Sequence, residues 1–249
     1  MSASDTTGLF TLGVAPEQYQ LPHPRLGLSV ILIIRRVLMR ALVLLREQNF
    51  NLAAATEDQV TAALRGSIEN NLRQSGEVAG FNKRTFDTVI RQGQWASFDY
   101  KSLTRAPDLF FKLRDDATEP RPVLSEFEGL FIEAKPVDSR HPVGSKYCDD
   151  GLIRFVRGDY AWAMQEAMML AYARDGRTIA GQLIPAMTET SRMSSLATLQ
   201  LPQGSSTTVA CSEAEAVHIS LHRRAFSWPN GKGLASDITV YHLWHRCSS

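Results

Sequence analysis

The sequence is poor in cysteine, which occupies only three of its 249 positions, Cys148, Cys211 and Cys247. Three cysteines without regular spacing do not make a disulfide framework, and such sparse use favours a reducing, cytoplasmic location. An excess of charge is also missing, because 27 Lys and Arg stand against 26 Asp and Glu. This balance excludes a strongly basic domain of the kind that binds nucleic acid over its whole surface, but it leaves room for a local basic patch.

Long apolar runs are absent as well. The N-terminal stretch MSASDTTGLF has no basic segment followed by an apolar one, so we do not expect a signal peptide. The most apolar segment, residues 26–48, is uncharged only from Leu26 to Ile34 and is then interrupted by arginines. Because a membrane-spanning helix needs about 20 apolar residues, we expect a helix packed in the core, with its arginines facing solvent, and no membrane partner.

Several catalytic and metal-binding motifs are missing too. The chain has no Gly-x-Ser-x-Gly nucleophile elbow and no Gly-x4-Gly-Lys-Ser/Thr phosphate loop, so neither chemistry is indicated. A zinc site in the C-terminal third is a weak interpretation, because Cys-x2-Cys is absent there and His242 and His245 face opposite sides of an expected strand. Packed or surface side chains are the better interpretation of the residues concerned, which are His218, His222, His242, His245, Cys211 and Cys247.

What the sequence does contain is the pattern of an α/β (α+β) fold, a central mixed β-sheet flanked by helices. Residues 1–24 are polar and interrupted by prolines, which is typical of an irregular arm. Residues 25–249 show no interior linker and are expected to form a single domain with a helical N-terminal region. Its core covers about residues 56–187, and its C-terminal strands lie within residues 213–246.

The order of the expected elements supports this fold class. Two helices come first, at 26–48 and 56–74, and Thr56 with Gln59 forms a capping box at the start of the second. Two strands with a long loop between them, a loop at 137–151, a long crossover helix, a third strand and two C-terminal strands follow. In chain order these later elements are expected at residues 107–114, 129–136, 152–176, 177–187, 215–226 and 237–246.

Three charged residues stand at the ends of the first two expected strands. Asp108 opens the first strand, and Glu133 and Lys135 close the second, whose sequence GLFIEAKPV is otherwise apolar. Residues two apart in a strand share a face, and antiparallel pairing places the start of one strand beside the end of the other. We therefore expect the three side chains to converge on a Mg²⁺ or Mn²⁺ site, with the lysine able to hold water and offset charge on a phosphate. The alternative is an exposed Glu–Lys pair that contributes little.

The pattern Pro107-Asp108 followed by Glu133-Ala134-Lys135, after an apolar run, resembles the PD-(D/E)xK nuclease superfamily. The resemblance implies a restriction-endonuclease-like core over about residues 69–187. It also implies Asp108 and Glu133 as metal ligands and Lys135 as the catalytic lysine.

The same resemblance implies two further site residues. Members of the superfamily often carry an acidic residue on a helix before the first strand, and Glu69 fits this role by position, with Glu77 as second choice. Some members carry a functional glutamine on the helix after the lysine strand, and Gln165 corresponds to it.

Two groups of basic residues are candidates for binding nucleic-acid phosphates. Arg154 and Arg157 are three apart on the expected crossover helix and share a face, and Lys146 lies close before them. Lys83 and Arg84 precede several aromatic residues, a combination that suits charge and stacking contacts. Solvated surface residues are the alternative interpretation of both groups.

These features together predict a metal-dependent nuclease that hydrolyses phosphodiester bonds, with DNA favoured over RNA. A homodimer and a subunit of a larger restriction or phage-defence complex are both compatible with the sequence. The alternative is a catalytically inactive nuclease-fold module that binds nucleic acid or protein. Whether Asp108 arrives beside Glu133 and Lys135 decides how much support the nuclease hypothesis keeps.

Overall fold

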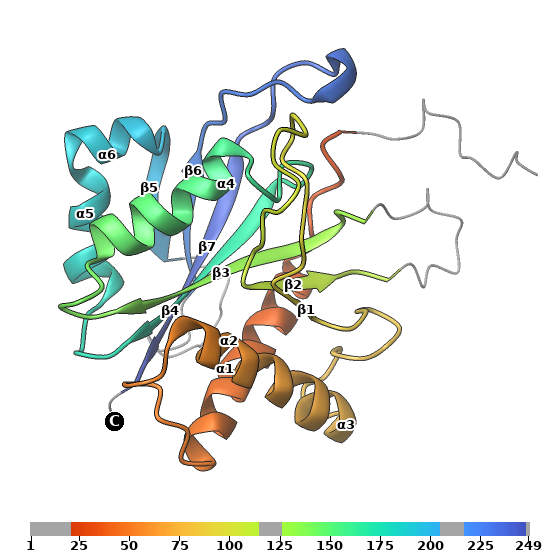
Figure 1. The fold of residues 1–249 in the computed structure, drawn as a ribbon, viewed down its shortest axis with the longest axis vertical. Coiled ribbons are helices and arrows are strands. Elements are labelled where there is room, and N and C mark those ends of the chain that lie inside the picture. The colour runs from red at the N-terminus through yellow and green to blue at the C-terminus, as the bar shows by residue number, and fades with distance from the viewer. Residues whose placement is uncertain (1–20, 115–125, 205–216, 248–249) are drawn as a thin grey trace, which may run out of the picture.

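The computed structural model describes residues 21–114, 126–204 and 217–247, and within them seven strands form one mixed sheet in the order β1-β2-β3-β4-β7-β6-β5 (Figure 1). The neighbours β3–β4 and β4–β7 are parallel, and the other pairs are antiparallel. The fold class predicted from the sequence is therefore confirmed. The strands are β1 Ile90–Arg91, β2 Leu109–Lys112, β3 Gly129–Val137, β4 Glu166–Ala173, β5 Thr198–Gly204, β6 His218–His222 and β7 Ile238–Arg246.

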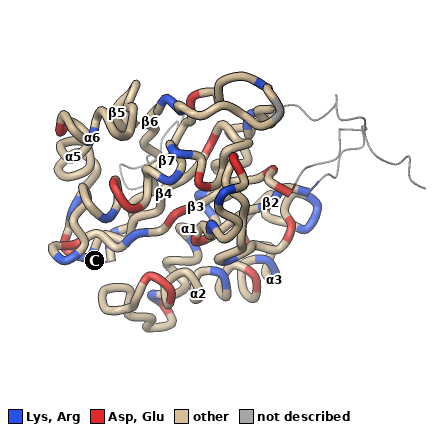
Figure 2. Tube along the Cα trace, turned by 45° about the horizontal axis from the view of Figure 1, so that its top comes forward, with Lys and Arg blue, Asp and Glu red and all other residues tan. Residues whose placement is uncertain are grey.

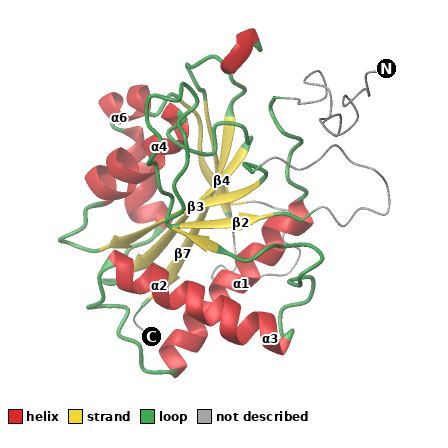
Figure 3. Ribbon diagram, turned by 45° about the vertical axis from the view of Figure 1, so that its right-hand side comes forward, coloured by secondary structure: helices red, strands yellow, loops and turns green. Residues whose placement is uncertain are grey.

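Helices pack on both faces of this sheet (Figures 1 and 3). Successive strand residues point to opposite faces, so His242 and His245 of β7, three positions apart, face the helices on opposite sides of the sheet. On one side, the Tyr147 hydroxyl of η3 forms a hydrogen bond with His242. On the other side, the positive charge of Arg46 in α1 contributes to lowering the pKa of His245. The helices are α1 Leu28–Glu47, α2 Glu57–Ser67, η2 Ile68–Leu72, α3 Arg73–Ser75, η3 Val143–Leu152, α4 Ile153–Arg157, η4 Ile179–Leu183, α5 Ile184–Thr188, α6 Thr190–Ser195 and η6 Pro229–Gly231.

The two N-terminal helices follow the sequence pattern closely. α1 buries an apolar stripe that includes Ile31, Ile34 and Leu38, as expected for a core helix. The expectation that its arginines face solvent is wrong for Arg35, which is buried. None of the helices in the described parts of the chain is long and apolar enough to cross a membrane.

The capping box at the start of α2 is confirmed. The Thr56 hydroxyl accepts a hydrogen bond from the Gln59 backbone N–H, and the Gln59 side chain accepts one from the Thr56 N–H. The helix continues through the π-helical turn η2 into α3 and ends at Gly76, whose φ of 66° is the left-handed conformation that glycine adopts without strain. This box fixes the position of Glu57, the first residue of the helix.

The predicted long crossover helix at 152–176 is wrong. The helix that begins in η3 ends with α4 at Arg157, and Gly158 then turns the chain with a φ of 73°. Residues 166–173 form β4, a strand buried along its whole length. A strand covered on both faces is apolar at nearly every position, so its sequence lacks the alternation that distinguishes a strand from a buried helix.

Other predicted boundaries change as well. Residues 177–187, predicted as a strand, form η4 and α5 instead, and the Thr178 hydroxyl caps their N-terminus by accepting from the Gly181 N–H. Most of the loop predicted at 137–151 is the π-helical segment η3, and β3 extends to Val137. Most of the arm predicted at 1–24 lies outside the described residues, as does Cys211.

The strand that carries the candidate site is held by a cluster of aromatic rings. β3 is buried at all nine of its residues. Trp95 packs edge-on against Phe110 of β2 and Phe131 of β3, and the Phe110 and Phe131 rings lie 4.3 Å apart between centroids. Such contacts are worth about 0.5–1.5 kcal/mol each beyond the area they bury. They make β2 and β3 a rigid base for the charged residues at their ends.

Candidate metal centre

Asp108 immediately precedes β2 and lies beside β3 where the pairing of these two strands ends. β2 pairs with β3 only from Gly129 to Ile132, although β3 continues to Val137. Just beyond the last pair, the Asp108 carboxylate accepts a hydrogen bond of 2.7 Å from the Ala134 backbone N–H. The carboxylate thus replaces the partner that a longer β2 would have given this buried N–H. The antiparallel pairing and the arrival of Asp108 beside Glu133 and Lys135 are as predicted.

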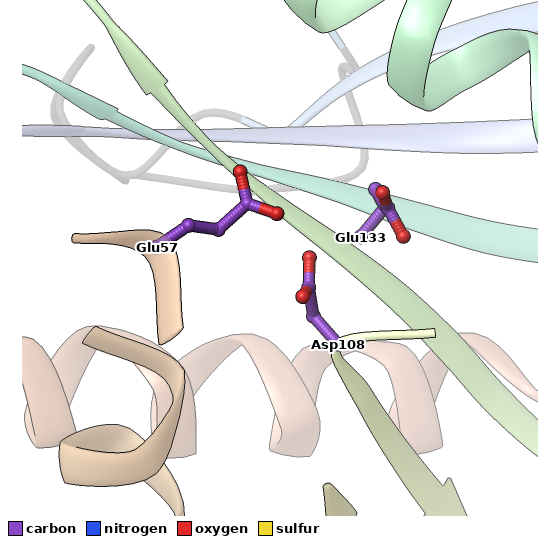
Figure 4. A group of neighbouring side chains, drawn as sticks. All are labelled: Glu57, Asp108 and Glu133. Carbon is purple, nitrogen blue, oxygen red and sulfur yellow. The ribbon is translucent and has the colours of Figure 1, made fainter. Parts of the chain in front are cut away.

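A third carboxylate, which sequence reasoning did not single out, completes the group. Glu57 is the first residue of α2, and its Oε1 lies 2.6 Å from the Lys135 Nζ. The same ammonium lies 2.9 Å from Glu133 Oε1. Ligand oxygens of Glu57, Asp108 and Glu133 all lie within 4.8 Å of one another (Figure 4). Oxygen atoms on opposite sides of one bound cation are separated by about 4–5 Å, so the three fit a shared Mg²⁺, Mn²⁺ or Ca²⁺.

The other acidic and amide candidates lie elsewhere. Glu69 accepts from the Arg73 guanidinium and from the Val89 N–H, and Glu77 pairs with Arg40. Gln165 precedes β4 instead of standing on a helix, and its amide donates to the His23 carbonyl. None of the three belongs to the carboxylate group, and the acidic residue that a helix before β2 brings to this group is Glu57. An acidic residue just after a capping threonine is common at the start of a helix, so its presence alone does not mark Glu57 as a site residue.

The electrostatics of the group show a shortage of positive charge. Burial, and then the carboxylates of Glu133 and Glu57, raise the pKa of Asp108 well above its usual value. Burial also raises the pKa of Glu133, against the effect of Lys135 and Arg154. Burial lowers the pKa of Lys135, but the three carboxylates together outweigh it and the net pKa is raised. Lys135 is therefore fully charged at neutral pH, and a divalent cation would relieve the remaining repulsion.

Glu133 is held by donors on both of its oxygens. Its Oε1 accepts from Lys135 Nζ and from Arg154 Nη1, each at 2.9 Å, and its Oε2 accepts from the Tyr160 hydroxyl. The Glu133 side chain is only 1% exposed. Burial and the adjacent Glu133 carboxylate raise the pKa of Tyr160 well above its usual value, so Tyr160 remains a hydrogen-bond donor. These contacts fix the orientation of the carboxylate.

Beside the group lies a polar cleft of about 890 Å³, which the buried Asp108 and Glu133 do not line. Glu57, Lys135 and Pro136 line it together with the loop 53–56 and residues of the segment 138–154. Acidic and basic residues are interleaved along the whole described chain (Figure 2), whereas the cleft gathers several cations near the carboxylates. The basic residues and the histidine that line it are Lys135, Arg140, His141, Lys146, Arg154 and Arg174.

The basic residues predicted to bind nucleic acid divide into two sets. Lys146 and Arg154 line the cleft, so both can reach a phosphate bound there. Arg157 is exposed on α4, and Lys83 and Arg84 are exposed in the segment before β1, but none of these three lines the cleft.

The C-terminal histidines form an internal hydrogen-bonded chain. The Tyr147 hydroxyl bonds His242 Nδ1, the Ser220 hydroxyl bridges His242 and His222, and His222 bonds the Leu196 carbonyl. Burial lowers the pKa of His222 to about 4 and holds that of His242 well below its usual value. Within the described residues, no set of three His, Cys, Asp or Glu ligands comes together here, and the Glu57, Asp108 and Glu133 group is the one that could hold a metal ion.

The capping box at Thr56 gives a first prediction. Thr56→Ala is expected to lower the free energy of unfolding by about 1 kcal/mol, because the α2 N-terminus loses a cap. It should also weaken Mn²⁺ binding, because Glu57 stands in the turn that frays. Thermal unfolding and a Mn²⁺ titration check both effects, with Thr56→Ser as the matched control that keeps the hydroxyl. Equal behaviour of the two variants would contradict the role given to the cap.

The comparisons with known proteins assign no family: no family model, no curated protein and no solved structure matches this chain.

Proposed function

We propose that the protein is a metal-dependent nuclease that hydrolyses phosphodiester bonds, with Glu57, Asp108 and Glu133 as the ligands of Mg²⁺ or Mn²⁺. The observation that carries the proposal is the convergence of three carboxylates and one lysine beside a cleft with several cations. Hard oxygen ligands suit these ions, and the local shortage of positive charge favours their binding. A bound divalent cation would activate water and stabilise the charge of the phosphate and of the leaving oxygen.

Lys135 acts in this proposal as a charged hydrogen-bond donor. Its ammonium is oriented by Glu57 and Glu133, which use two of its three N–H donors. Since its pKa is raised, it does not serve as a general base in the metal-free protein. The third N–H is available to a water or to a non-bridging phosphate oxygen, where the positive charge offsets developing negative charge.

The cleft provides the proposed phosphate contacts. Arg154 and Lys146 stand on one wall, from which they can position neighbouring phosphates without reading bases. The likeness of the Asp108 to Lys135 pattern to the PD-(D/E)xK superfamily favours DNA over RNA as the substrate. A cytoplasmic location and action as a homodimer or as a subunit of a restriction or defence complex belong to the same proposal.

One observation favours a second candidate, a catalytically inactive module that binds nucleic acid or protein. Glu133 is already satisfied by Lys135, Arg154 and Tyr160, so it needs no metal to be stable in the interior. The two candidates differ in whether the protein binds a divalent cation and whether phosphodiester bonds are cleaved.

A cleavage assay with two matched glutamate variants tests the proposal. The wild type is expected to cut DNA with Mg²⁺ or Mn²⁺ and to lose this activity in EDTA. Glu57→Gln should lower the rate about 10- to 100-fold, the scale for weakening a metal ligand shell. Glu69→Gln, placed outside the carboxylate group, should change the rate less than about threefold when both variants are folded. Absence of metal-dependent cleavage of both DNA and RNA would leave the inactive module as the better account.

A further inference from the structure

Two cations share one oxygen of Glu133. Lys135 Nζ and Arg154 Nη1 both lie 2.9 Å from Oε1, whereas Oε2 faces the Tyr160 hydroxyl. Each carboxylate oxygen offers about two lone-pair positions, so those of Oε1 are taken. The Lys135 ammonium that contacts Glu133 Oε1 also contacts Glu57, so it lies between these two carboxylates. A metal bridging Glu57 and Glu133 therefore competes with one of the two cations.

Arg154 is the cation that can leave. The Lys135 side chain is 6% exposed and lies 2.6 Å from Glu57 as well. The Arg154 side chain is 32% exposed, and its second ion pair, to Asp150, is 3.5 Å long, at the limit of a hydrogen bond. It also contacts the hydroxyl of Tyr160, which is neutral. Because Arg154 lines the cleft, its guanidinium can swing into solvent without entering a dry interior. Moving it costs less than moving Lys135.

We infer that Arg154 is an exchangeable counter-ion, which neutralises Glu133 in the metal-free protein and turns to a substrate phosphate when a divalent cation takes Glu133 Oε1. This inference rests on the proposed function, because it requires the metal centre and a phosphate-bearing substrate. A guanidinium released from a carboxylate presents paired N–H donors that match a phosphate. Metal and phosphate binding then reinforce each other through one side chain, and the reinforcement is reciprocal.

The first part of the test is a Mn²⁺ titration by calorimetry, without nucleic acid. Arg154→Gln removes the competing cation and is expected to bind Mn²⁺ about 3- to 10-fold more tightly than the wild type. Lys146→Gln removes the same charge from the same cleft, but Lys146 contacts Asp150 and not Glu133, so the affinity should change less than about twofold. Arg154→Lys keeps the charge and should stay close to the wild type, and it supplies a second reading if the glutamine variant is unstable.

The second part measures coupling by the anisotropy of a fluorescent phosphorothioate oligodeoxynucleotide, with and without Mn²⁺. In the wild type Mn²⁺ should tighten oligonucleotide binding, and the tightening factor is the ratio of the Kd without Mn²⁺ to the Kd with Mn²⁺. Arg154→Gln should reduce this tightening factor at least about fivefold. Lys146→Gln should weaken binding equally in both conditions and leave the factor unchanged.

The outcomes separate the inference from the proposed function. If the wild type binds Mn²⁺ and Arg154→Gln binds it no more tightly, the exchange is wrong while the metal centre stands. An Arg154→Gln variant with tighter Mn²⁺ binding and an undiminished tightening factor would also overturn the inference, because the released side chain would then not reach the phosphate. Failure of both proteins to bind Mn²⁺ overturns the metal centre and the inference together. The exchange is supported if Arg154→Gln, but not Lys146→Gln, binds Mn²⁺ more tightly than the wild type and also shows a smaller effect of Mn²⁺ on oligonucleotide binding.

Discussion

Asp108→Asn is expected to lower metal-dependent cleavage by about 10³-fold and, at the same time, to stabilise the metal-free protein. The loss of cleavage follows from replacing a charged ligand of the proposed metal by a neutral one. The gain in stability follows from the surroundings of Asp108. Burial, the Glu133 carboxylate and the Glu57 carboxylate all raise its pKa, which means that they disfavour its charged form. Asparagine keeps an oxygen for the Ala134 N–H, so the backbone contact survives. We expect a gain of about 1 kcal/mol or more in the free energy of unfolding at pH 7.

The gain should depend on pH in a defined direction. Well below the usual aspartate pKa of about 4, Asp108 is protonated in both the folded and unfolded chain, so wild type and variant should be equally stable. As the pH rises, the unfolded carboxyl ionises first, because the folded pKa is raised. The wild type therefore loses stability relative to Asp108→Asn until the pH passes the folded pKa. Urea unfolding in EDTA at several pH values measures the difference, and a variant less stable at pH 7 would contradict this account.

Lys135→Met is the counterpart of Asp108→Asn, because it removes a positive charge from the same group. It leaves Glu57 and Glu133 without their shared ammonium, so it should lower the free energy of unfolding by about 3–5 kcal/mol, as breaking a buried ion pair does. It should also abolish cleavage. Opposite effects of the two substitutions on stability, with the same effect on activity, would show that the group is arranged for a cation and not for stability.

Arg224→Met is expected to lower the free energy of unfolding by about 3–5 kcal/mol. Arg224 is 2% exposed, and its guanidinium donates to backbone carbonyls from two segments. Removing it takes the guanidinium donor from the Met164 and Ser236 carbonyls, each at a cost of about 1–3 kcal/mol, whereas the Ala161 and Trp162 carbonyls keep the Met164 N–H and the Trp228 indole N–H. Burial lowers the pKa of Arg224 only to about 10, so the side chain is charged at neutral pH. The carbonyls belong to Ala161, Trp162, Met164 and Ser236.

Arg224→Met should also disturb the position of Tyr160 in the metal centre. Tyr160 immediately precedes Ala161, whose carbonyl Arg224 bonds, and its hydroxyl donates to Glu133. Urea unfolding measures the loss, and Arg223→Met, at the exposed neighbouring position, is the control, with an expected change below about 0.5 kcal/mol. A loss of less than about 1 kcal/mol for Arg224→Met would mean that water can replace the guanidinium.

The convergence of Asp108, Glu133 and Lys135 could be predicted from the sequence because it depends on local rules. Alternation within one strand places Glu133 and Lys135 on the same face, and antiparallel pairing of consecutive strands brings Asp108 to them. Glu57 could not be predicted in the same way. Its position depends on where the loop before α2 lies, and that loop is held by Arg174, which donates to the Leu52 and Ala55 carbonyls from beyond the end of β4.

β4 was missed for a related reason. The run MMLAYA is apolar on both faces because helices cover both sides of the sheet, so its sequence has the composition of a buried helix as well as of a central strand. Arg154 was predicted as a phosphate contact, but its bond to Glu133 arises only because the helix that carries it lies over β3. Long-range packing decides both points, and neither periodicity nor spacing encodes it.

Glu57, Asp108 and Glu133 are proposed to bind one divalent cation together. The most direct measurement is anomalous diffraction from crystals of the wild-type protein soaked in Mn²⁺. We expect a single strong peak within about 2.0–2.6 Å of an oxygen from each of the three carboxylates, with Lys135 retained beside it. A Mn²⁺ soak that leaves the group without a peak, with Arg154 still bonded to Glu133, would contradict the claim.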